Sequence, residues 1–80
     1  MAIYYFNVQE CGTLKEDLVG REFARFEAAQ AHALEIARNI MSDEVREGRL
    51  CVACNVDILD ADRKLLVAVP FRQALSIIGA

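Results

Sequence analysis

The most constraining feature of this 80-residue sequence is one uninterrupted segment, Glu27–Glu47, which contains no glycine or proline. Ala, Leu, Glu, Arg and Met dominate it, and these residues have high helix propensity. Gly48 follows directly and suits the position after a helix end, where a left-handed backbone is common. The segment predicts one long helix, and the remaining elements of a chain this short must pack around it.

The apolar side chains of this helix cover about half of its circumference when successive residues are placed about 100° apart. The stripe that we expect to face a sheet contains four residues: Ala29, Ala33, Ile36 and Ile40. Three more apolar residues, Leu34, Met41 and Val45, continue around the cylinder, whereas one sheet requires an arc of only about 100°. We therefore expect these three to remain available for a second neighbour.

The first part of the chain predicts at least one strand. Apolar and polar residues alternate through Ile3–Gln9, which is typical of a half-buried strand, and this places Tyr5 on its outer face. Glu10–Gly20 shows no such period and predicts a loop, with the tip of a hairpin as one form that it could take. Whether Arg21–Phe26 forms a short returning strand that carries Phe23 inward stays open. The core-facing residues of the first strand would be Tyr4, Phe6 and Val8.

The last part of the chain predicts a hairpin and a short helix. Apolar residues alternate through 50–59 and 65–69, and the Asp-rich segment 60–63 has the composition of a turn. Pro70 lacks a backbone donor and suits the first turn of a helix, so Phe71–Ile78 predicts a terminal helix. The whole chain, 1–80, is thus expected to form one α+β domain: a small antiparallel sheet on one long central helix, with the sheet order open.

Two hairpin registers fit the turn. A three-residue loop with Arg63 in the left-handed region brings Leu66 and Ala68 to the core face. A two-residue loop at 61–62 gives a consistent apolar face, and we prefer it. The pairs that this second register predicts are Ile58 with Leu65, Val56 with Val67, and Cys54 with Val69.

Composition favours self-association. Apolar residues make up 55% of the chain, whereas a domain this small buries only about 60% of the surface of its unfolded form. A two-fold interface between identical chains would cover the excess without lengthening the chain. Composition therefore predicts a homodimer.

Charge and cysteine content limit the partners and the compartment. The net charge is −3 and the nine Lys and Arg residues are scattered, which makes nucleic acid an unfavoured partner. No stretch approaches the roughly 20 apolar residues that cross a bilayer, and no basic region of a signal peptide precedes the first strand. Three cysteines are an odd number, which fits a reducing compartment. We expect a cytoplasmic protein without a membrane partner.

The pair Cys51 and Cys54 has the spacing of half a zinc site or a redox pair, which Cys11 and His32 could complete. In a strand, however, residues three apart point to opposite faces. We therefore predict structural thiols, with no cofactor, no bound metal and no disulfide between Cys51 and Cys54. His32 falls on the polar half of the helix near Glu35, where a solvated pair is the ordinary outcome.

The sequence resembles an uncharacterised family of small bacterial domains, common in alphaproteobacteria. The resemblance rests on Tyr-Tyr-Phe-Asn-Val at 4–8 and Val-Pro-Phe-Arg-Gln-Ala at 69–74. Between them, Asp-Leu-Val-Gly at 17–20, Ala-Ala-Gln-Ala at 28–31 and Asp-Ala-Asp at 60–62 follow the order of the family. Asn7 stands where the family often has His, and Arg63 where it often has Gly. The resemblance implies the order strand, helix, hairpin, short helix. It does not indicate an activity, because the family has no known function.

No pattern in the sequence identifies an activity, so the function is unknown at this stage. The leading hypothesis is a non-enzymatic protein-interaction module that self-associates or binds an unidentified protein. Its interaction surface would contain four residues: Leu34, Met41, Val45 and Tyr5.

Two other classes remain as alternatives. A small nucleic-acid-binding protein would use Tyr5 to stack on bases. A metal or redox protein would use Cys51, Cys54 and His32.

Overall fold

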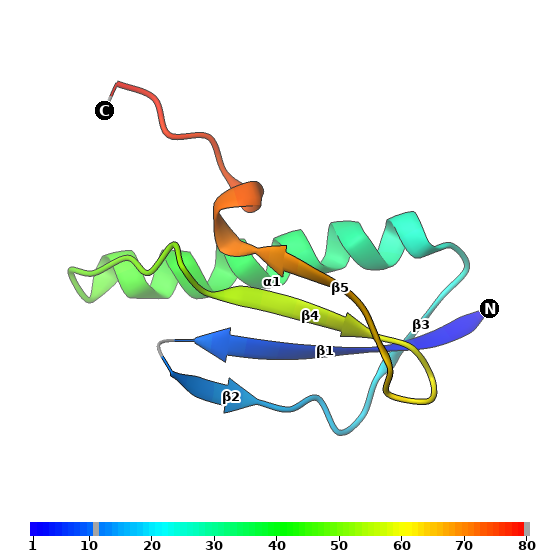
Figure 1. The fold of residues 1–80 in the computed structure, drawn as a ribbon. Helices are drawn as coiled ribbons and strands as arrows, with labels where there is room; N and C mark the ends of the chain where they lie inside the picture. Colours follow the sequence, from blue (N-terminus) through cyan, green and yellow to red (C-terminus); the bar gives the residue numbers. More distant parts are fainter. Residues whose placement is uncertain (11, 80) are drawn as a thin grey trace.

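The computed structural model describes residues 1–10 and 12–79, which form an antiparallel five-stranded sheet with one long helix across one face (Figure 1). The order is β2-β1-β4-β5, and β3 also pairs with β1. The α+β prediction is confirmed. The elements are β1 (Ala2–Glu10), β2 (Thr13–Lys15), β3 (Arg21–Phe23), α1 (Phe26–Arg46), β4 (Asn55–Leu59), β5 (Leu65–Pro70) and a 3₁₀ turn η1 (Phe71–Ala74).

β1 forms the strand that its alternation predicted and lies at the centre of the sheet. Of its three expected core-facing residues, Phe6 and Val8 are buried and Tyr4 is half-buried. Strand β1 pairs with β4 over Tyr5–Gln9. Two short strands also pair with β1, β2 over Val8–Glu10 and β3 over Ala2–Tyr4. The segment after β1 is therefore a hairpin, and the short returning strand that the sequence left open exists and ends at Phe23.

Asp17 joins the two short strands to β1. Its carboxylate accepts the Phe6 N–H at 3.1 Å, at a point of β1 that pairs with neither β2 nor β3. The same carboxylate accepts the N–H groups of Val19 and Gly20, each at 3.0 Å. Asn7 completes the contact, because its side-chain oxygen accepts the Asp17 N–H at 2.9 Å. A side chain thus replaces the strand pairing that the loop interrupts.

The helix begins and ends one residue before its predicted limits. Gly48 adopts φ 85°, and its N–H donates to the Val45 carbonyl at 3.0 Å. The Arg49 N–H donates to the Glu44 carbonyl, also at 3.0 Å, which completes a Schellman ending.

The buried stripe of α1 differs from the predicted one. It follows steps of four and three residues along one line: Ala29, Ala33, Ala37, Met41 and Glu44. Ile36 and Ile40, expected at its centre, are only half-buried at its flank. Met41, expected on the uncovered flank, is 2% exposed, so that expectation was wrong. The small alanine side chains let the helix backbone approach the sheet, and the larger isoleucines then fit only beside the contact.

The preferred hairpin register was wrong by two residues. Val69 lies opposite Val56, and Val67 lies opposite Ile58. The register then shifts between Ile58 and Leu59, so that Leu59 lies opposite Leu65. Arg63 has φ 64°, the left-handed conformation of the other loop that we considered. Because a shift of two residues preserves the face, Val67 and Val69 still point toward the core as expected.

Asp60 stabilises this turn. Its side chain accepts the N–H groups of Asp62 and Lys64, each at 2.9 Å, and its carbonyl accepts the Arg63 N–H at 2.9 Å. A local carboxylate of this kind favours a turn without any tertiary contact.

Two further elements of the second half exist but are shorter than expected. Strand β4 begins only at Asn55, so residues 50–54 are not part of it. The predicted helix Phe71–Ile78 is a single 3₁₀ turn. The Phe71 N–H donates to the Cys54 carbonyl at 2.9 Å, and the Arg38 guanidinium donates to the Ala74 carbonyl at 2.7 Å. After it the chain extends away from the body (Figure 1), and Ile78 is 91% exposed.

Replacing Met41 by alanine should lower the free energy of unfolding by about 2–5 kcal/mol, because it leaves a cavity in the core. The control is Val45→Ala on the same helix, where the side chain is 60% exposed. That variant should stay within about 0.5 kcal/mol of the wild type. Urea denaturation followed by circular dichroism measures both. Equal losses for the two variants would contradict the buried position of Met41.

Gly20→Ala should destabilise the protein more than Gly48→Ala. Both glycines have positive φ, so both variants carry the backbone cost of about 1–2 kcal/mol. Only at Gly20 would the new Cβ also lie 2.9 Å from side-chain atoms of Ile3 and Tyr5, whereas open space surrounds Gly48. We expect a further loss of about 1–3 kcal/mol at Gly20. Thermal unfolding of the two variants side by side gives the difference, and no difference would show that the loop moves away from β1 easily.

Candidate functional site

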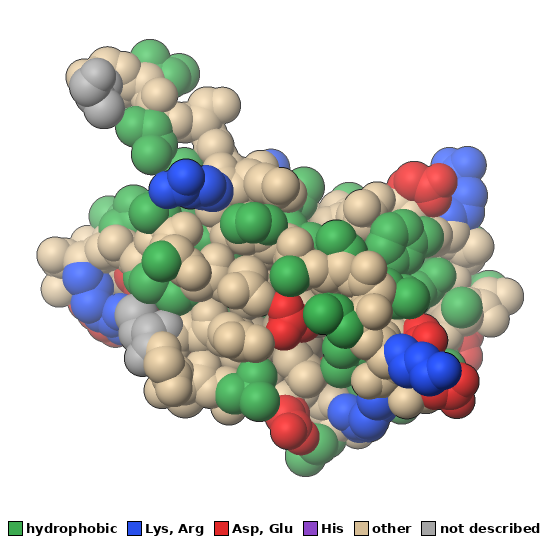
Figure 2. Space-filling model, in the orientation of Figure 1, with side chains coloured by type: hydrophobic (Ala, Val, Ile, Leu, Met, Phe, Trp, Pro, Cys, Tyr) green, Lys and Arg blue, Asp and Glu red, His purple; other side chains and the backbone are tan. Residues whose placement is uncertain are grey.

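The outer edge of β5 is an apolar surface of the fold. The sheet ends at β5, and no other strand of the described chain pairs with its outer side. Figure 2 shows hydrophobic side chains gathered along this strand. Leu65 is 59% and Leu66 46% exposed. We call residues 65–69 the β5 edge.

The β5 edge lacks most features that protect sheet edges. It reads Leu-Leu-Val-Ala-Val, with no charged residue, and only the irregularity near Leu65 and the following Pro70 interrupt its pairing potential. Edge strands of soluble proteins usually carry lysine, proline or a covering segment, because exposed N–H and C=O groups bind other strands. This surface can therefore accept a β-strand.

The structure does not bring the four predicted interaction residues together. Met41 belongs to the core, and Leu34 is half-buried against the core. Val45 is exposed and borders an apolar groove of about 390 Å³ near Leu50. Tyr5 instead lies on the opposite face of the sheet from the helix, because it alternates with the buried Phe6 on β1.

Tyr5 is already in contact with a cation. The Arg63 guanidinium lies 4.1 Å from the centre of its ring, within the range of a cation–π interaction. The same guanidinium donates to the Asp17 carbonyl at 3.2 Å. Burial alone would raise the pKa of Asp17, but the N–H groups that its carboxylate accepts, together with nearby Arg63, hold it below its usual value. The hairpin turn and the loop after β2 are thereby linked across Tyr5.

A charged cluster lies where the ends of β1 and α1 meet. Glu44 is 2% exposed, and its carboxylate accepts the Cys51 N–H at 3.1 Å and pairs with Arg49 at 3.3 Å. Glu10 shares a hydrogen bond with Glu44 and pairs with Lys15 at 3.6 Å. Nothing in the sequence distinguishes Glu44 except its position three residues after Met41, which continues the buried stripe.

The two carboxyl groups of this cluster shift in opposite directions. Burial would raise the pKa of Glu44, but the Cys51 N–H, the hydrogen bond with Glu10 and the Arg49 charge together lower it. The hydrogen bond to Glu44 raises the pKa of Glu10, with burial and the charge of Glu44 adding to it, against Lys15 and Arg49. Glu44 therefore keeps the charge, and Glu10 is the one that holds a proton more readily.

His32 is not the solvated residue that we expected beside Glu35. Its ring is half-buried and lies 4.9 Å from the Phe6 ring and 5.4 Å from the Phe23 ring, between centroids. Burial lowers its pKa, and the charge of Arg21 adds to this. The residue belongs to an aromatic cluster that joins β3, β1 and α1.

The predicted four-ligand set is not assembled by the residues that the structure describes. Cys51 and Cys54 line one cavity, but His32 lies twelve residues before Glu44 on α1, a distance of about 18 Å along the helix. Cys11 lies outside the described residues. Among those described, no three His, Cys, Asp or Glu residues are placed to hold a metal ion.

Comparison with family models identifies the chain. The model of a domain of unknown function, DUF6894, matches residues 3–72. The chain belongs to the DUF6894 family. This confirms the resemblance to a family without known function, while comparisons with curated proteins and with solved structures give no match.

The DUF6894 match spans β1 through the first residues of η1, so it includes the Asp17 contact, the β5 edge and the charged cluster. Arg63 stands where the family resemblance leads us to expect glycine, and it has the left-handed backbone that glycine adopts freely. No helix of the described DUF6894 chain is long and apolar enough to cross a membrane.

Glu44→Gln should change how stability depends on pH. The pKa of Glu44 in the folded protein is below its ordinary value of 4.5. The stabilisation that the Glu44 carboxylate gives the folded protein is therefore present above pH 4.5 and is lost as the pH falls toward the folded pKa. Glu10 changes stability in the opposite direction, because its pKa is raised in the folded protein. The stabilisation that it gives is present below pH 4.5 and is lost as the pH rises through the raised pKa.

The measurement is the free energy of urea unfolding of wild type and variant between pH 7 and pH 3. The advantage of the wild type over Glu44→Gln should shrink as the pH falls below 4.5. Glu35→Gln, an exposed substitution on the same helix, is the matched control. An advantage of the wild type that grew on acidification would contradict the assignment of the charge to Glu44.

Proposed function

We propose that this DUF6894 chain is a non-enzymatic protein-interaction module that forms a homodimer by pairing the β5 edges of two copies. The observation that carries the proposal is an apolar strand at the end of the sheet, with Leu65 and Leu66 largely exposed and no strand of the described chain on its outer side. Pairing with a second strand would use both its backbone groups and its apolar side chains.

A second copy fits this edge well. Antiparallel pairing about a two-fold axis places the same five residues opposite one another, which is the isologous geometry of most homodimers. The chain carries a net charge of −3, yet the β5 edge has no charged residue, so no like charges would oppose each other there. Each apolar Å² removed from water contributes roughly 25 cal/mol before the cost of association.

The alternative functions have less support. A nucleic-acid-binding role for Tyr5 would need an accessible ring, and Arg63 lies against it. A metal role for Cys51, Cys54 and His32 would need His32 to leave its aromatic contacts with Phe6 and Phe23. We also propose a cytoplasmic location, on the odd number of cysteines alone.

The test is light scattering after size-exclusion chromatography at tens of micromolar protein. We expect the wild type at twice the chain mass, and Leu66→Lys at the chain mass, because pairing of residues 65–69 about the axis would place each new lysine against the apolar strand of the partner. The control is Leu18→Lys, a substitution of the same kind in the loop between β2 and β3, where Leu18 is 76% exposed and lies outside the β5 edge.

This control should remain a dimer. A monomeric wild type would overturn the proposal. So would a Leu66→Lys variant that is as dimeric as the wild type, since the interface would then lie elsewhere. Circular dichroism of Leu66→Lys distinguishes loss of the interface from loss of the fold.

A further inference from the structure

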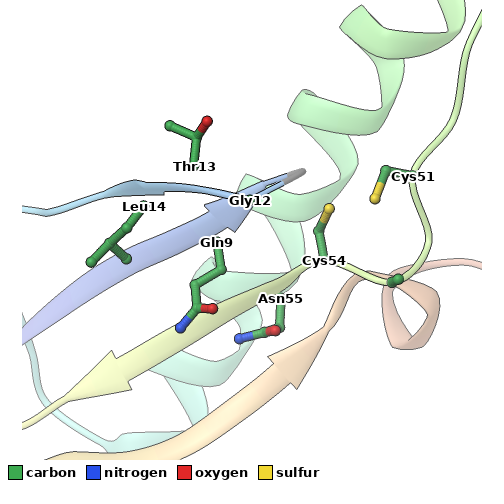
Figure 3. A pocket seen from close by; sticks show the side chains of 8 residues that line it. Gln9, Gly12, Thr13, Leu14, Cys51, Cys54 and Asn55 are labelled. Carbon is green, nitrogen blue, oxygen red and sulfur yellow. The ribbon is translucent and has the colours of Figure 1, made fainter.

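Cys51 and Cys54 lie in a bend before β4, and this changes what the pair can do. Side chains three residues apart point to opposite faces in a strand, but β4 begins only at Asn55. Both cysteines line a single cavity of about 260 Å³ between this bend and the end of β1. Figure 3 shows the two sulfur atoms turned toward the same space. The geometry that argued against a disulfide is therefore absent.

The bend is anchored at both cysteines. The Cys51 N–H donates to the buried Glu44 carboxylate at 3.1 Å, and the Cys54 carbonyl accepts the Phe71 N–H at 2.9 Å. Only Val52 and Ala53 lie between them, and Ala53 is exposed. Both ends of this short bend are thereby fixed, and both side chains line the same cavity.

The two thiols differ in access. Cys51 is half-buried and can be reached from the cavity, whereas Cys54 is buried. In thiol–disulfide exchange an accessible thiol is attacked or attacks first, and a less accessible one resolves the mixed disulfide. The pair has this arrangement.

We propose that Cys51 and Cys54 form a reversible dithiol–disulfide pair that exchanges with small-molecule disulfides of the glutathione type. The Cys51 thiolate attacks one sulfur of the small disulfide, and the first small thiolate leaves and takes up the proton that Cys51 released. The Cys54 sulfur, on losing its proton, then attacks the Cys51 sulfur. The second small thiolate leaves with that proton, so two electrons pass to the small disulfide and two small thiols are formed.

The pair is suited to reversible exchange rather than to permanent cross-linking. A disulfide between residues three apart closes a very small loop and restricts the unfolded chain little. An accessible disulfide of this kind is more easily reduced than a buried structural one. The proposal is independent of the homodimer, because the cavity lies on the β1 side of β4 and the β5 edge on the other.

The experiment incubates the native protein with mixtures of reduced and oxidised glutathione, then blocks the remaining thiols by alkylation. Trypsin cleavage after Arg49 and Arg63 gives one peptide, 50–63, which contains Cys51 and Cys54 but not Cys11. We expect this peptide to lose two hydrogen masses in oxidising mixtures and to regain both thiols on return to reducing ones. In Cys54→Ser the same peptide should instead carry one glutathione on Cys51.

Alkylation of the reduced wild type provides a second measurement that needs no variant. Cys51 should react about tenfold faster than Cys54, in keeping with its greater exposure. The proposal is overturned if peptide 50–63 keeps both thiols in every mixture that oxidises a dithiol control peptide of the same sequence. It is also overturned if the oxidised peptide is linked to Cys11 or to a second chain.

Discussion

The close packing of α1 on the sheet is the contact on which the rest of the structure depends. Ala29, Ala33 and Ala37 are fully buried, and single methyl groups at three successive turns let the helix backbone lie near the strands. A line that continues in steps of four and three from Ala37 reaches Met41 and then Glu44. The same packing that buries the alanines therefore buries a carboxylate. That carboxylate is stable only because Arg49, Glu10 and a backbone N–H surround it.

Elements with a strong local period could be predicted from the sequence. The alternation of β1 gave its buried residues, Phe6 and Val8, and the absence of glycine and proline gave α1 within one residue at each end. The residues of the buried stripe were harder to predict, because steps of three and of four residues are equally compatible with a helix. The choice between Ile36 and Ala37 depends on how closely the sheet approaches, and no periodicity contains that distance. The hairpin register depended in the same way on a non-glycine residue, Arg63, adopting a positive φ.

The candidate site could be predicted less well than the fold. The β5 edge is an edge only because β1 and β4 occupy the centre of the sheet, and strand order is not visible in the alternation of any one strand. The burial of Glu44 was not predicted, because a charged residue in line with the apolar residues of a helix face usually marks the end of the buried part of that face. The expectation that Cys51 and Cys54 lie in a strand was wrong for a different reason: apolar alternation continues through 50–54, but the chain bends before β4 begins.

The apolar surplus of the sequence is distributed in a way that favours a strand partner over a helix partner. Met41, which was expected to add to an uncovered helix flank, is absorbed by the core, and Val45 is left beside a groove whose backbone is already hydrogen-bonded within α1. A neighbour on that flank would gain side-chain contacts but no strand pairing. At the β5 edge the exposed Leu65 and Leu66 accompany a strand with one pairing side open. A strand added there would remove apolar surface from water and satisfy backbone groups in the same step, and neither gain requires α1 to move.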